Sequence, residues 1–322
     1  MAKNENLHKA KAAKNDEFYT QATDIEKEMV HYRNHFKGKT IFCNCDDPTW
    51  SEFWKYFHLN FEFLGLKKLI STHYDAHEPT YKMEYEGGND TDTEAGVKTR
   101  LMQNGDFRSK ECLAILDQPD VIVCTNPPFS LFTEYVHTLL AHNAKFIIIG
   151  NRNALTYCDI FPLVKSNAMW LGYPFAGGNA YFGIPKNADT SIYAKGVYNP
   201  ETGLVHFRNC VWYTNLDIPK RHEEVILWEN YTPEKYPKYD NYNAINVDKV
   251  SHIPVDYNGV MGVPITFLDK YNPDQFEIIG QSNKGDTSPE TEALRTDPKH
   301  KHGGLVNGKE KYMRIFIRRK VA

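Results

Sequence analysis

Apolar and polar residues alternate along the first half of the chain in blocks that predict strands and helices in turn. Short runs of Val, Ile and other apolar residues, each closed by Asp, Asn, Gly or Pro, predict buried strands. Between these runs, apolar residues recur at the three-to-four spacing of an amphipathic helix. The strands are predicted at 39–45, 67–74, 121–125, 145–150 and 169–173, with a short one ending at 104–107. The helices are predicted at 24–36, 51–63, 109–116, 131–142 and 155–165.

This order of elements indicates an α/β fold, in which strand–helix–strand units build a sheet with parallel strands. Asp24 is the expected N-cap of the first helix, whose inward face holds Ile25, Met29 and Tyr32. In open sheets of this kind, ligands bind at the edge where the parallel strands end. The residues that directly follow strands are therefore the first candidates for a functional site.

The pattern changes after residue 173, where Gly, Pro, Tyr and Asn become frequent and predict hairpins and long loops. Aromatic and amide side chains suit stacking on nucleic-acid bases and hydrogen bonding to their edges. A loop-rich extension that packs the core explains the same composition equally well. We divide the chain into a mobile basic arm at 1–15, a core at 16–173 and a C-terminal region at 174–322. The apolar part of that region, at about 260–280, is expected to pack back on the core.

Three polar or charged segments stand outside the alternating pattern. Residues 79–104 are rich in Gly, Asp and Thr and predict an exposed hairpin or loop, and 281–304 predict a mobile loop. Residues 295–322 hold nine Lys or Arg against two Asp or Glu, beside a predicted strand at 312–320. This basic strand is explained either as a patch that contacts phosphate or as an edge strand protected by its charge.

Acidic residues follow the first two strands. Asp46 and Asp47 come directly after Cys45, without the Gly-rich turn that cradles phosphate groups. The missing turn disfavours a cofactor that is bound through phosphate groups. The cofactor S-adenosylmethionine has no phosphate, and its ammonium group, ribose and adenine need polar partners, so carboxylates at strand ends suit it. Asp46 and Asp47 are our candidates for its amino-acid end, and Asp75, which follows Tyr74, is our candidate for its ribose. We include Cys45, Tyr74 and Asn126 among the cofactor-binding residues.

Two aromatic stretches are candidates for contact with the adenosine of the same cofactor. Asp106 can accept a hydrogen bond from an adenine amino group while Phe107 stacks on the ring. Phe18, Tyr19 and Thr20, just before the first helix, suit a lid over the adenosine. Packing in the core explains these three residues equally well.

The run Thr-Asn-Pro-Pro-Phe at 125–129 carries the most specific chemistry. Two successive prolines end the strand and supply no backbone N–H. The side-chain oxygen of Asn126 and the carbonyl of Pro127 can then accept both protons of an exocyclic amino group, which is a poor nucleophile because its lone pair is delocalised. Pro128 stiffens the turn, and Phe129 can stack on the base. The alternative is a strand-ending turn with a core Phe.

Composition limits the class of protein. The chain has 322 residues, 41% of them hydrophobic, enough for one large or two ordinary domains. Its net charge of −3 leaves only a local patch for nucleic acid. Cys43 and Cys45 lack a matching pair at metal-ligand spacing, so we expect reduced thiols and no metal. With neither a signal peptide nor a membrane span predicted, we expect a cytoplasmic protein.

Taken together, the motifs resemble those of the EcoRI-type adenine-specific DNA methyltransferases. The matching stretches are Asp-Glu-Phe-Tyr-Thr-Gln at 16–21, Cys-Asn-Cys-Asp-Asp-Pro at 43–48, Leu-Lys-Lys-Leu-Ile at 66–70, Thr-Asn-Pro-Pro-Phe-Ser at 125–130, Phe-Ile-Ile-Ile-Gly-Asn at 146–151 and Gly-Val-Pro-Ile-Thr-Phe-Leu-Asp-Lys-Tyr at 262–271. They span nearly the whole chain, in the family's order. The acidic first turn without glycine is part of the match.

The resemblance implies a Rossmann-like S-adenosylmethionine-dependent methyltransferase that modifies N6 of an adenine flipped out of double-stranded DNA. It implies a monomer, in a prokaryotic or phage-infected cell, with a target-recognition region at 174–322 and a lid at 18–20. Extended to specificity, it suggests GAATTC and a separate cognate restriction endonuclease. The alternatives are an RNA adenine or protein glutamine methyltransferase and a catalytically inactive DNA-binding relative.

Overall fold

The computed structural model describes residues 18–76, 80–89, 91–184, 189–283, 285–297 and 303–320. The chain divides into two compact units. Unit 1 consists of Met1–Arg152 and Gly172–Leu216, and unit 2 consists of Asn153–Leu171 and Asp217–Ala322. The predicted mobile arm at 1–15 lies outside the described residues. None of the described helices is long and apolar enough to cross a membrane.

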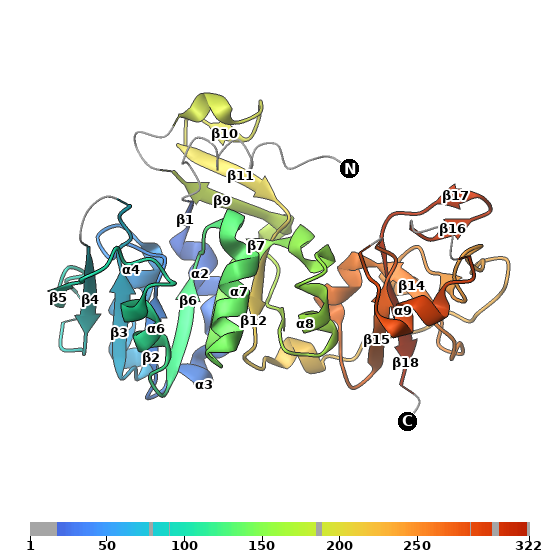
Figure 1. The fold of residues 1–322 in the computed structure, drawn as a ribbon, viewed down its shortest axis with the longest axis horizontal. Coiled ribbons are helices and arrows are strands. Elements are labelled where there is room, and N and C mark those ends of the chain that lie inside the picture. The colour runs from blue at the N-terminus through green and yellow to red at the C-terminus, as the bar shows by residue number, and fades with distance from the viewer. Residues whose placement is uncertain are drawn as a thin grey trace. The chain divides into compact units, whose positions relative to one another are not determined.

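A large mixed sheet forms the centre of unit 1 (Figure 1). Its strands within this unit are, in spatial order, β5 (Val97–Arg100), β4 (Tyr81–Tyr85), β3 (Lys68–Thr72), β2 (Thr40–Cys43), β6 (Val121–Thr125), β7 (Lys145–Asn151) and β12 (Cys210–Thr214). The four strands from β3 to β7 are parallel, whereas β4, β5 and β12 run antiparallel to their neighbours. The expectation of an α/β fold with a sheet containing parallel strands is confirmed.

The central strands are those with the longest apolar runs. All residues of β2 and β6 are buried, as expected for strands that are covered on both faces. Phe42 of β2 pairs with Ile70 of β3 on one side and with Val123 of β6 on the other. The chain leaves β2 towards β3 and returns on its other side to β6, so the loops after β2 and β6 diverge. Such a switch point leaves a crevice at the carboxyl edge of the sheet.

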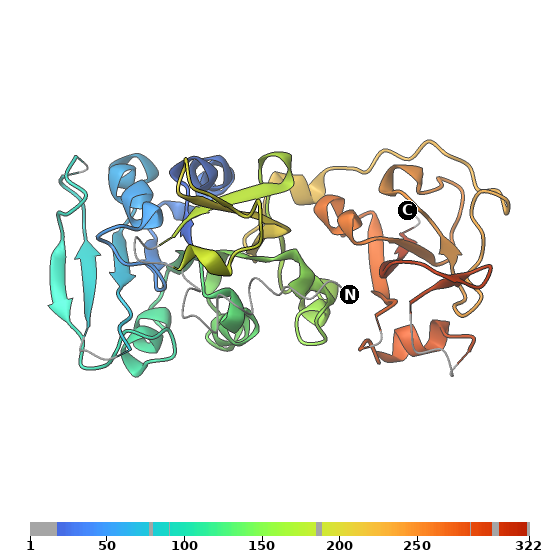
Figure 2. The same cartoon turned by 90° about the horizontal axis from the view of Figure 1, so that it is seen from above.

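Helices cover both faces of this sheet, as Figures 1 and 2 show together. On one face lie α2 (Ala22–Met29), α3 (Arg33–Phe36), α4 (Glu52–Leu59) and α5 (Phe61–Leu64), and on the other α6 (Lys110–Leu116) and α7 (Phe132–Ala141). The side chain of Ser51 caps α4 and that of Ser109 caps α6. The prediction of Asp24 as N-cap is wrong, because α2 begins after Gln21 and Asp24 lies in its first turn. Its predicted inward residues Ile25, Met29 and Tyr32 are fully buried.

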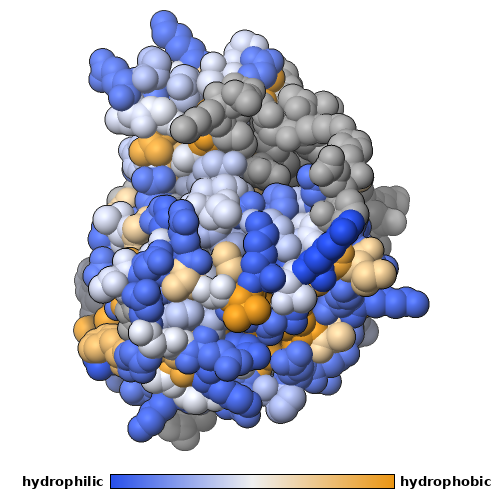
Figure 3. Space-filling view, turned by 90° about the vertical axis from the view of Figure 1, so that its left-hand side faces the viewer, coloured by the Kyte–Doolittle hydropathy of each residue, from blue (hydrophilic) through white to orange (hydrophobic). Residues whose placement is uncertain are grey.

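The polar segment 79–104 forms the predicted hairpin, within residues 80–89 and 91–104. Strands β4 and β5 pair antiparallel, and all four residues of β5 are exposed. Figure 3 looks at this end of the molecule and shows mainly hydrophilic side chains with separate hydrophobic ones. The prediction that a short strand ends at 104–107 is wrong, because β5 already ends at Arg100 and 104–107 are irregular. Within them Gly105, at a φ of +71°, passes so close to the His73 carbonyl that a side chain would clash.

A second, smaller sheet belongs to unit 1 and lies over the carboxyl edge of the large one (Figure 1). Its strand order is β1 (Tyr19–Thr20), β9 (Asn179–Gly183), β11 (Leu204–Arg208) and β10 (Tyr198–Asn199), and its described pairs are antiparallel. We call it the small sheet. The segment predicted as a lid therefore begins as an edge strand, joined to a hairpin that follows far later in the chain.

Unit 2 has a sheet of its own, in the order β13 (Ile245–Asn246), β14 (Met261–Pro264), β18 (Arg314–Arg319) and β15 (Phe276–Gln281). The other regular elements of this unit include β8 (Trp170–Leu171), the hairpin of β16 (Leu305–Val306) and β17 (Lys309–Glu310), α8 (Phe161–Lys165) and α9 (Pro289–Leu294). Because β18 lies between two partners, the explanation of its charges as edge protection is wrong. The expectation that 260–280 packs on the large sheet stays a prediction.

The loop predicted at 281–304 contains more structure than its polar composition indicates. Within residues 285–297 it forms α9, whose Thr291 and Leu294 are buried. Asp286 holds the preceding turn by accepting hydrogen bonds from the Gln281 backbone and the Thr291 hydroxyl, both at 2.8 Å. The prediction of a mobile loop is thus wrong for this part, because a few buried contacts order an otherwise polar segment.

Candidate active site

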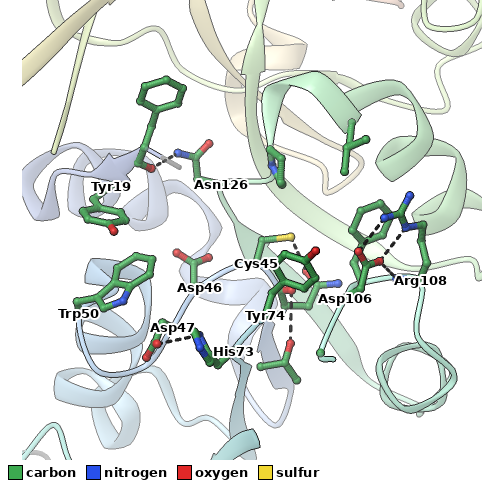
Figure 4. Close-up of a pocket in the computed structure, with 17 residues that line it drawn as sticks. Tyr19, Cys45, Asp46, Asp47, Trp50, His73, Tyr74, Asp106, Arg108 and Asn126 are labelled. Carbon is green, nitrogen blue, oxygen red and sulfur yellow. Dashed lines mark hydrogen bonds and ion pairs between the residues drawn. The ribbon is translucent and has the colours of Figure 1, made fainter. Parts of the chain in front are cut away.

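A cavity of about 210 Å³ opens in unit 1 where β2, β3 and β6 end (Figure 4). Of the residues predicted from the sequence, its lining includes Phe18, Tyr19, Cys45, Asp46, Asp47, Tyr74, Asp106, Phe107, Asn126 and Pro128. The lining does not include Thr20, Asp75, Pro127 or Phe129. Loops from separate parts of the chain thus meet at the crevice that the strand order creates.

Asp46 is buried beneath the turn that follows β6. Its carboxylate accepts hydrogen bonds from the hydroxyl of Ser51 at 2.8 Å, from the hydroxyl of Thr125 and from the backbone N–H of Asn126. Burial raises the pKa of Asp46 to about 6, against the effect of these hydrogen bonds. The Asp46 carboxyl group therefore ties the loop after β2 to the first residue of the turn.

Asp47, the next residue, lies in a different environment. It accepts hydrogen bonds from the backbone and hydroxyl of Thr49 at 2.8 and 2.7 Å, from the Tyr81 hydroxyl at 3.0 Å and from His73 Nδ1 at 2.8 Å. Burial alone raises its pKa, but the bonds from His73 and Thr49 outweigh this effect and bring the pKa to about 2. Asp47 is therefore a fixed anion at the cavity wall, suited to a cationic ligand group.

Asp106 and Phe107 enter the cavity from the turn that Gly105 makes. Both oxygens of Asp106 accept hydrogen bonds from Arg108, through Nε at 2.8 Å and Nη2 at 2.7 Å, and Arg108 also reaches Glu134 at 3.1 Å. Burial raises the pKa of Asp106, but the Arg108 bonds lower it further than burial raises it. The guanidinium keeps this carboxylate ionised and fixes its orientation, while further lone pairs remain for a donor.

Aromatic rings form another wall of the cavity. The rings of Tyr19 and Trp50 lie 4.0 Å apart between centroids, tilted by 37°, and both line the cavity (Figure 4). Phe107 is buried, with 4% of its surface exposed, and packs edge-on against Tyr135 at 4.9 Å. These rings give the cavity apolar surfaces of the kind that hold a heterocycle.

The turn after β6 divides its side chains between two surroundings. Asn126 and Pro128 line the cavity. The Asn126 Nδ2 atom donates to the Phe18 carbonyl at 2.6 Å, while its Oδ1 atom is buried without a hydrogen-bond partner (Figure 4). Phe129 instead packs on the small sheet, against Phe18, Phe182 and Phe207. An unpaired buried acceptor is costly, and this one is available to a donor that enters from the cavity.

Several lining residues were not identified from the sequence: Asn44, Trp50, Thr72, His73, Gly105, Arg108 and Leu131. Each stands within four residues of a predicted one, but an isolated Trp or His after a strand carries no signal of its own. Arg108 had the clearest signal, because a cation two residues after an acid can turn back on it. Thr20 is not part of the cavity lining, and its buried hydroxyl has no hydrogen-bond partner.

The fold and this site define a class of protein: an α/β enzyme with a ligand cavity at the switch point of a parallel sheet and an amide–proline turn beside it. Comparison with known proteins gives the family. The family model described as "Adenine-specific methyltransferase EcoRI" matches residues 6–320. The chain therefore belongs to the EcoRI-type family of adenine-specific methyltransferases, as its motifs predicted.

Curated relatives match over almost the whole chain. "Type II methyltransferase M.EcoRI" from Escherichia coli is 43% identical over 333 residues, covering 99% of this chain and 98% of the relative. "Type II methyltransferase M.MgeORF184P" from Mycoplasma genitalium is 38% identical over 328 residues, covering 97% and 98%. "Type II methyltransferase M.MpnI" from Mycoplasma pneumoniae is 35% identical over 320 residues, covering 98% of each. None of the solved structures matches the chain.

Proposed function

We propose that this protein is a type II DNA methyltransferase that transfers a methyl group from S-adenosylmethionine to N6 of an adenine flipped out of double-stranded DNA. Family membership supports the adenine specificity. The relatives named type II methyltransferases support the remainder by similarity. The observation that carries the proposal is the Oδ1 atom of Asn126, a buried acceptor without a partner, on a turn at the cavity wall.

The turn supplies what the amino group of adenine needs. The lone pair of the amino nitrogen is delocalised into the adenine ring, so the nitrogen must be drawn towards tetrahedral geometry before it can attack the methyl group. Asn126 Oδ1 and the Pro127 carbonyl would accept hydrogen bonds from its two hydrogens and hold the lone pair towards the cavity. The bond from Asn126 Nδ2 to Phe18 fixes the amide so that its oxygen, not its nitrogen, is available.

The cavity residues fit the proposed cofactor. Asp47, ionised at neutral pH, would bind the ammonium group, and Asp106 would accept a hydrogen bond from the adenine amino group beside Phe107. The Tyr19–Trp50 pair offers an apolar wall for the remainder. The bound cofactor supplies an electrophilic methyl group on its sulfonium. Asp46, which also lines the cavity, would lie beside Asp47 at the amino-acid end of the cofactor and would position the turn through its three donors.

The target base and the DNA require further contacts. Flipping an adenine costs a few kcal/mol, and stacking on an aromatic side chain such as Phe129 returns about 1–3 kcal/mol. We assign target recognition to residues 174–322, whose described part is rich in loops and includes basic residues on β18. We further propose a monomer that acts in the cytoplasm, with GAATTC as its first expected site and a separate cognate endonuclease.

Transfer of labelled methyl from S-adenosylmethionine tests the proposal directly. Purified protein would be supplied with duplex DNA, RNA or a protein extract. The proposal predicts label in duplex DNA, recovered after digestion as N6-methyladenine. Label in RNA or protein alone, or none in any substrate although the cofactor binds, would refute it.

A further inference from the structure

Four phenylalanines from separate parts of unit 1 form one aromatic cluster. Phe129 lies 5.7 Å from Phe18, 6.2 Å from Phe182 and 6.4 Å from Phe207 between ring centroids. Phe18 and Phe207 are 4.8 Å apart, edge to face, and Phe182 lies 5.9 Å from Phe207. We call this set the phenylalanine cluster. It joins the turn after β6 to three strands or strand ends of the small sheet.

The register of the small sheet explains why Phe207 faces this turn. Phe207 of β11 pairs with Ala180 of β9, and Val205 pairs with Phe182, so all four side chains share one face. On the opposite face, Tyr181 and His206 stack at 4.9 Å. One face of the sheet is thus apolar and directed at the turn, and the other carries an exposed aromatic pair.

Burial separates the members of the cluster. Phe182 is fully buried and only 6% of Phe18 is exposed, so these two rings close one side of Phe129. Phe129 and Phe207 are only half-buried. Phe207 lies 6.4 Å from Phe129 between ring centroids and is likewise only half-buried, so these two rings are the members of the cluster that a base can contact. The Phe18 residue that packs with Phe207 also holds the Asn126 amide, so the ring and the amide share one support.

We propose that Phe207 forms the second wall of the target-base site and contacts the flipped adenine beside Phe129. This inference rests on the proposed function. The ring contributes apolar contact and no hydrogen bond, so Phe207 holds the extrahelical base without reading which sequence surrounds it. Phe207 lies outside the lining of the cofactor cavity, so its contribution is separable from cofactor binding.

The test compares methylation kinetics of Phe207→Ala and Phe207→Leu with those of the unaltered protein, on a duplex carrying its own recognition site. Phe207→Ala is expected to lower kcat/KM by about 10- to 100-fold, the range seen when a stacked aromatic is removed. Phe207→Leu, which keeps apolar volume, guards against misfolding and is expected to lower kcat/KM by about 5-fold or more. Phe207→Tyr is expected to retain most activity.

A second duplex, with an abasic site opposite the target adenine, separates base holding from general damage. Its adenine is already unpaired, so flipping costs less and the variants should recover most of the lost kcat/KM. Cofactor affinity should stay within about twofold. Phe63→Ala, which truncates an exposed phenylalanine of α5 outside both the cavity lining and the region assigned to target recognition, is the control and should leave kcat/KM unchanged.

A kcat/KM within twofold of the unaltered protein for both Phe207→Ala and Phe207→Leu would overturn the inference. So would a loss that persists equally on the abasic duplex or accompanies weaker cofactor binding, since either indicates a structural role. If the unaltered protein itself transfers no methyl to DNA, the proposed function fails, which is a distinguishable result.

Discussion

The loop after β2 and the turn after β6 leave neighbouring parallel strands at the same edge of the sheet. The loop presents Asp47 to the cavity as a fixed anion, and beside it Asp46 accepts hydrogen bonds from the turn. The turn presents Asn126 to the cavity and directs Phe129 to the small sheet. The first is therefore suited to a small cationic ligand, and the second lies between that ligand and a base arriving from outside.

Under the proposed function, this difference would let one sheet edge serve two ligands. Each strand end is held by the other, because Asp46 of the loop accepts hydrogen bonds from Thr125 and from the Asn126 backbone. We call the loop after β2 the cofactor half of the site and the turn after β6 its base half. The two halves share this anchor but present different side chains to the cavity. Substitutions should therefore separate the loss of cofactor binding from the loss of turnover.

The largest effect is expected for Asn126→Ala in the base half. Removing the amide leaves the amino group of adenine without one of its two proposed acceptors, and loss of one such preorganised group costs on the order of 10²–10³-fold in kcat. Cofactor affinity, measured by calorimetry, should stay within a few fold. A variant that keeps substantial turnover would contradict the role of Asn126, and Asn126→Asp tests whether an oxygen acceptor alone suffices.

Asp47→Asn should weaken cofactor binding more than it slows turnover. A hydrogen bond to a charged group contributes about 1.5–3 kcal/mol, so the Kd for S-adenosylmethionine should rise about 10- to 100-fold, with a smaller change of kcat at saturation. Because the pKa of Asp47 is about 2, binding by the unaltered protein should show no ionisation of this group between pH 5 and 9. An unchanged Kd in the variant would remove Asp47 from the cofactor site.

The raised pKa of Asp46 leads us to expect that the stability of the fold changes with pH. The pKa of the Asp46 carboxyl group is about 6 in the folded protein and near its ordinary value of 3.8 in the unfolded chain. Between these values the unfolded chain ionises first, so the protonated carboxyl stabilises the fold at low pH, and this contribution disappears as the pH rises through about 6. Relative to Asp46→Asn, the free energy of unfolding of the unaltered protein should fall by about 3 kcal/mol between pH 3.5 and 7. A constant difference in urea unfolding would contradict this.

The smallest effect is expected for Asp75→Asn. The sequence placed Asp75 beside the ribose, but the cavity lining includes Tyr74 and not Asp75. Substitution of a partly exposed side chain outside the cavity lining should change the Kd for the cofactor by about twofold at most. A tenfold rise in Kd would restore the original assignment and extend the cofactor half further along the loop after β3.

Sequence reasoning succeeded where the signal is local. Runs such as Val121–Thr125 are apolar and end at a proline pair, so the strand and its turn could be placed without knowing the neighbours. Asp46 and Asp47 were found together for the same reason, although their opposite pKa shifts depend on donors as distant as Thr125 and His73. The shifts could not be predicted from residues that are adjacent in the chain.

The rest depended on contacts between distant segments. The pairing of Tyr19 with Gly183 adds β1 to the small sheet, and two residues of ordinary strand propensity give no sign of it. The aromatic cluster around Phe129 likewise depends on β9 and β11, so the sequence left open whether this ring is free to stack or packs in the core. Likewise, the basic strand β18 looked like an edge strand because its partners, β14 and β15, could not be inferred from composition.

The most direct test of the central claim is long-read sequencing of plasmid DNA from cells that lack other adenine methyltransferases and express either the unaltered chain or Asn126→Ala. We predict N6-methyladenine confined to one short sequence motif with the unaltered chain and none with the variant. No N6-methyladenine with the unaltered chain, or equal methylation in both, would contradict the assignment of DNA adenine methylation to this site.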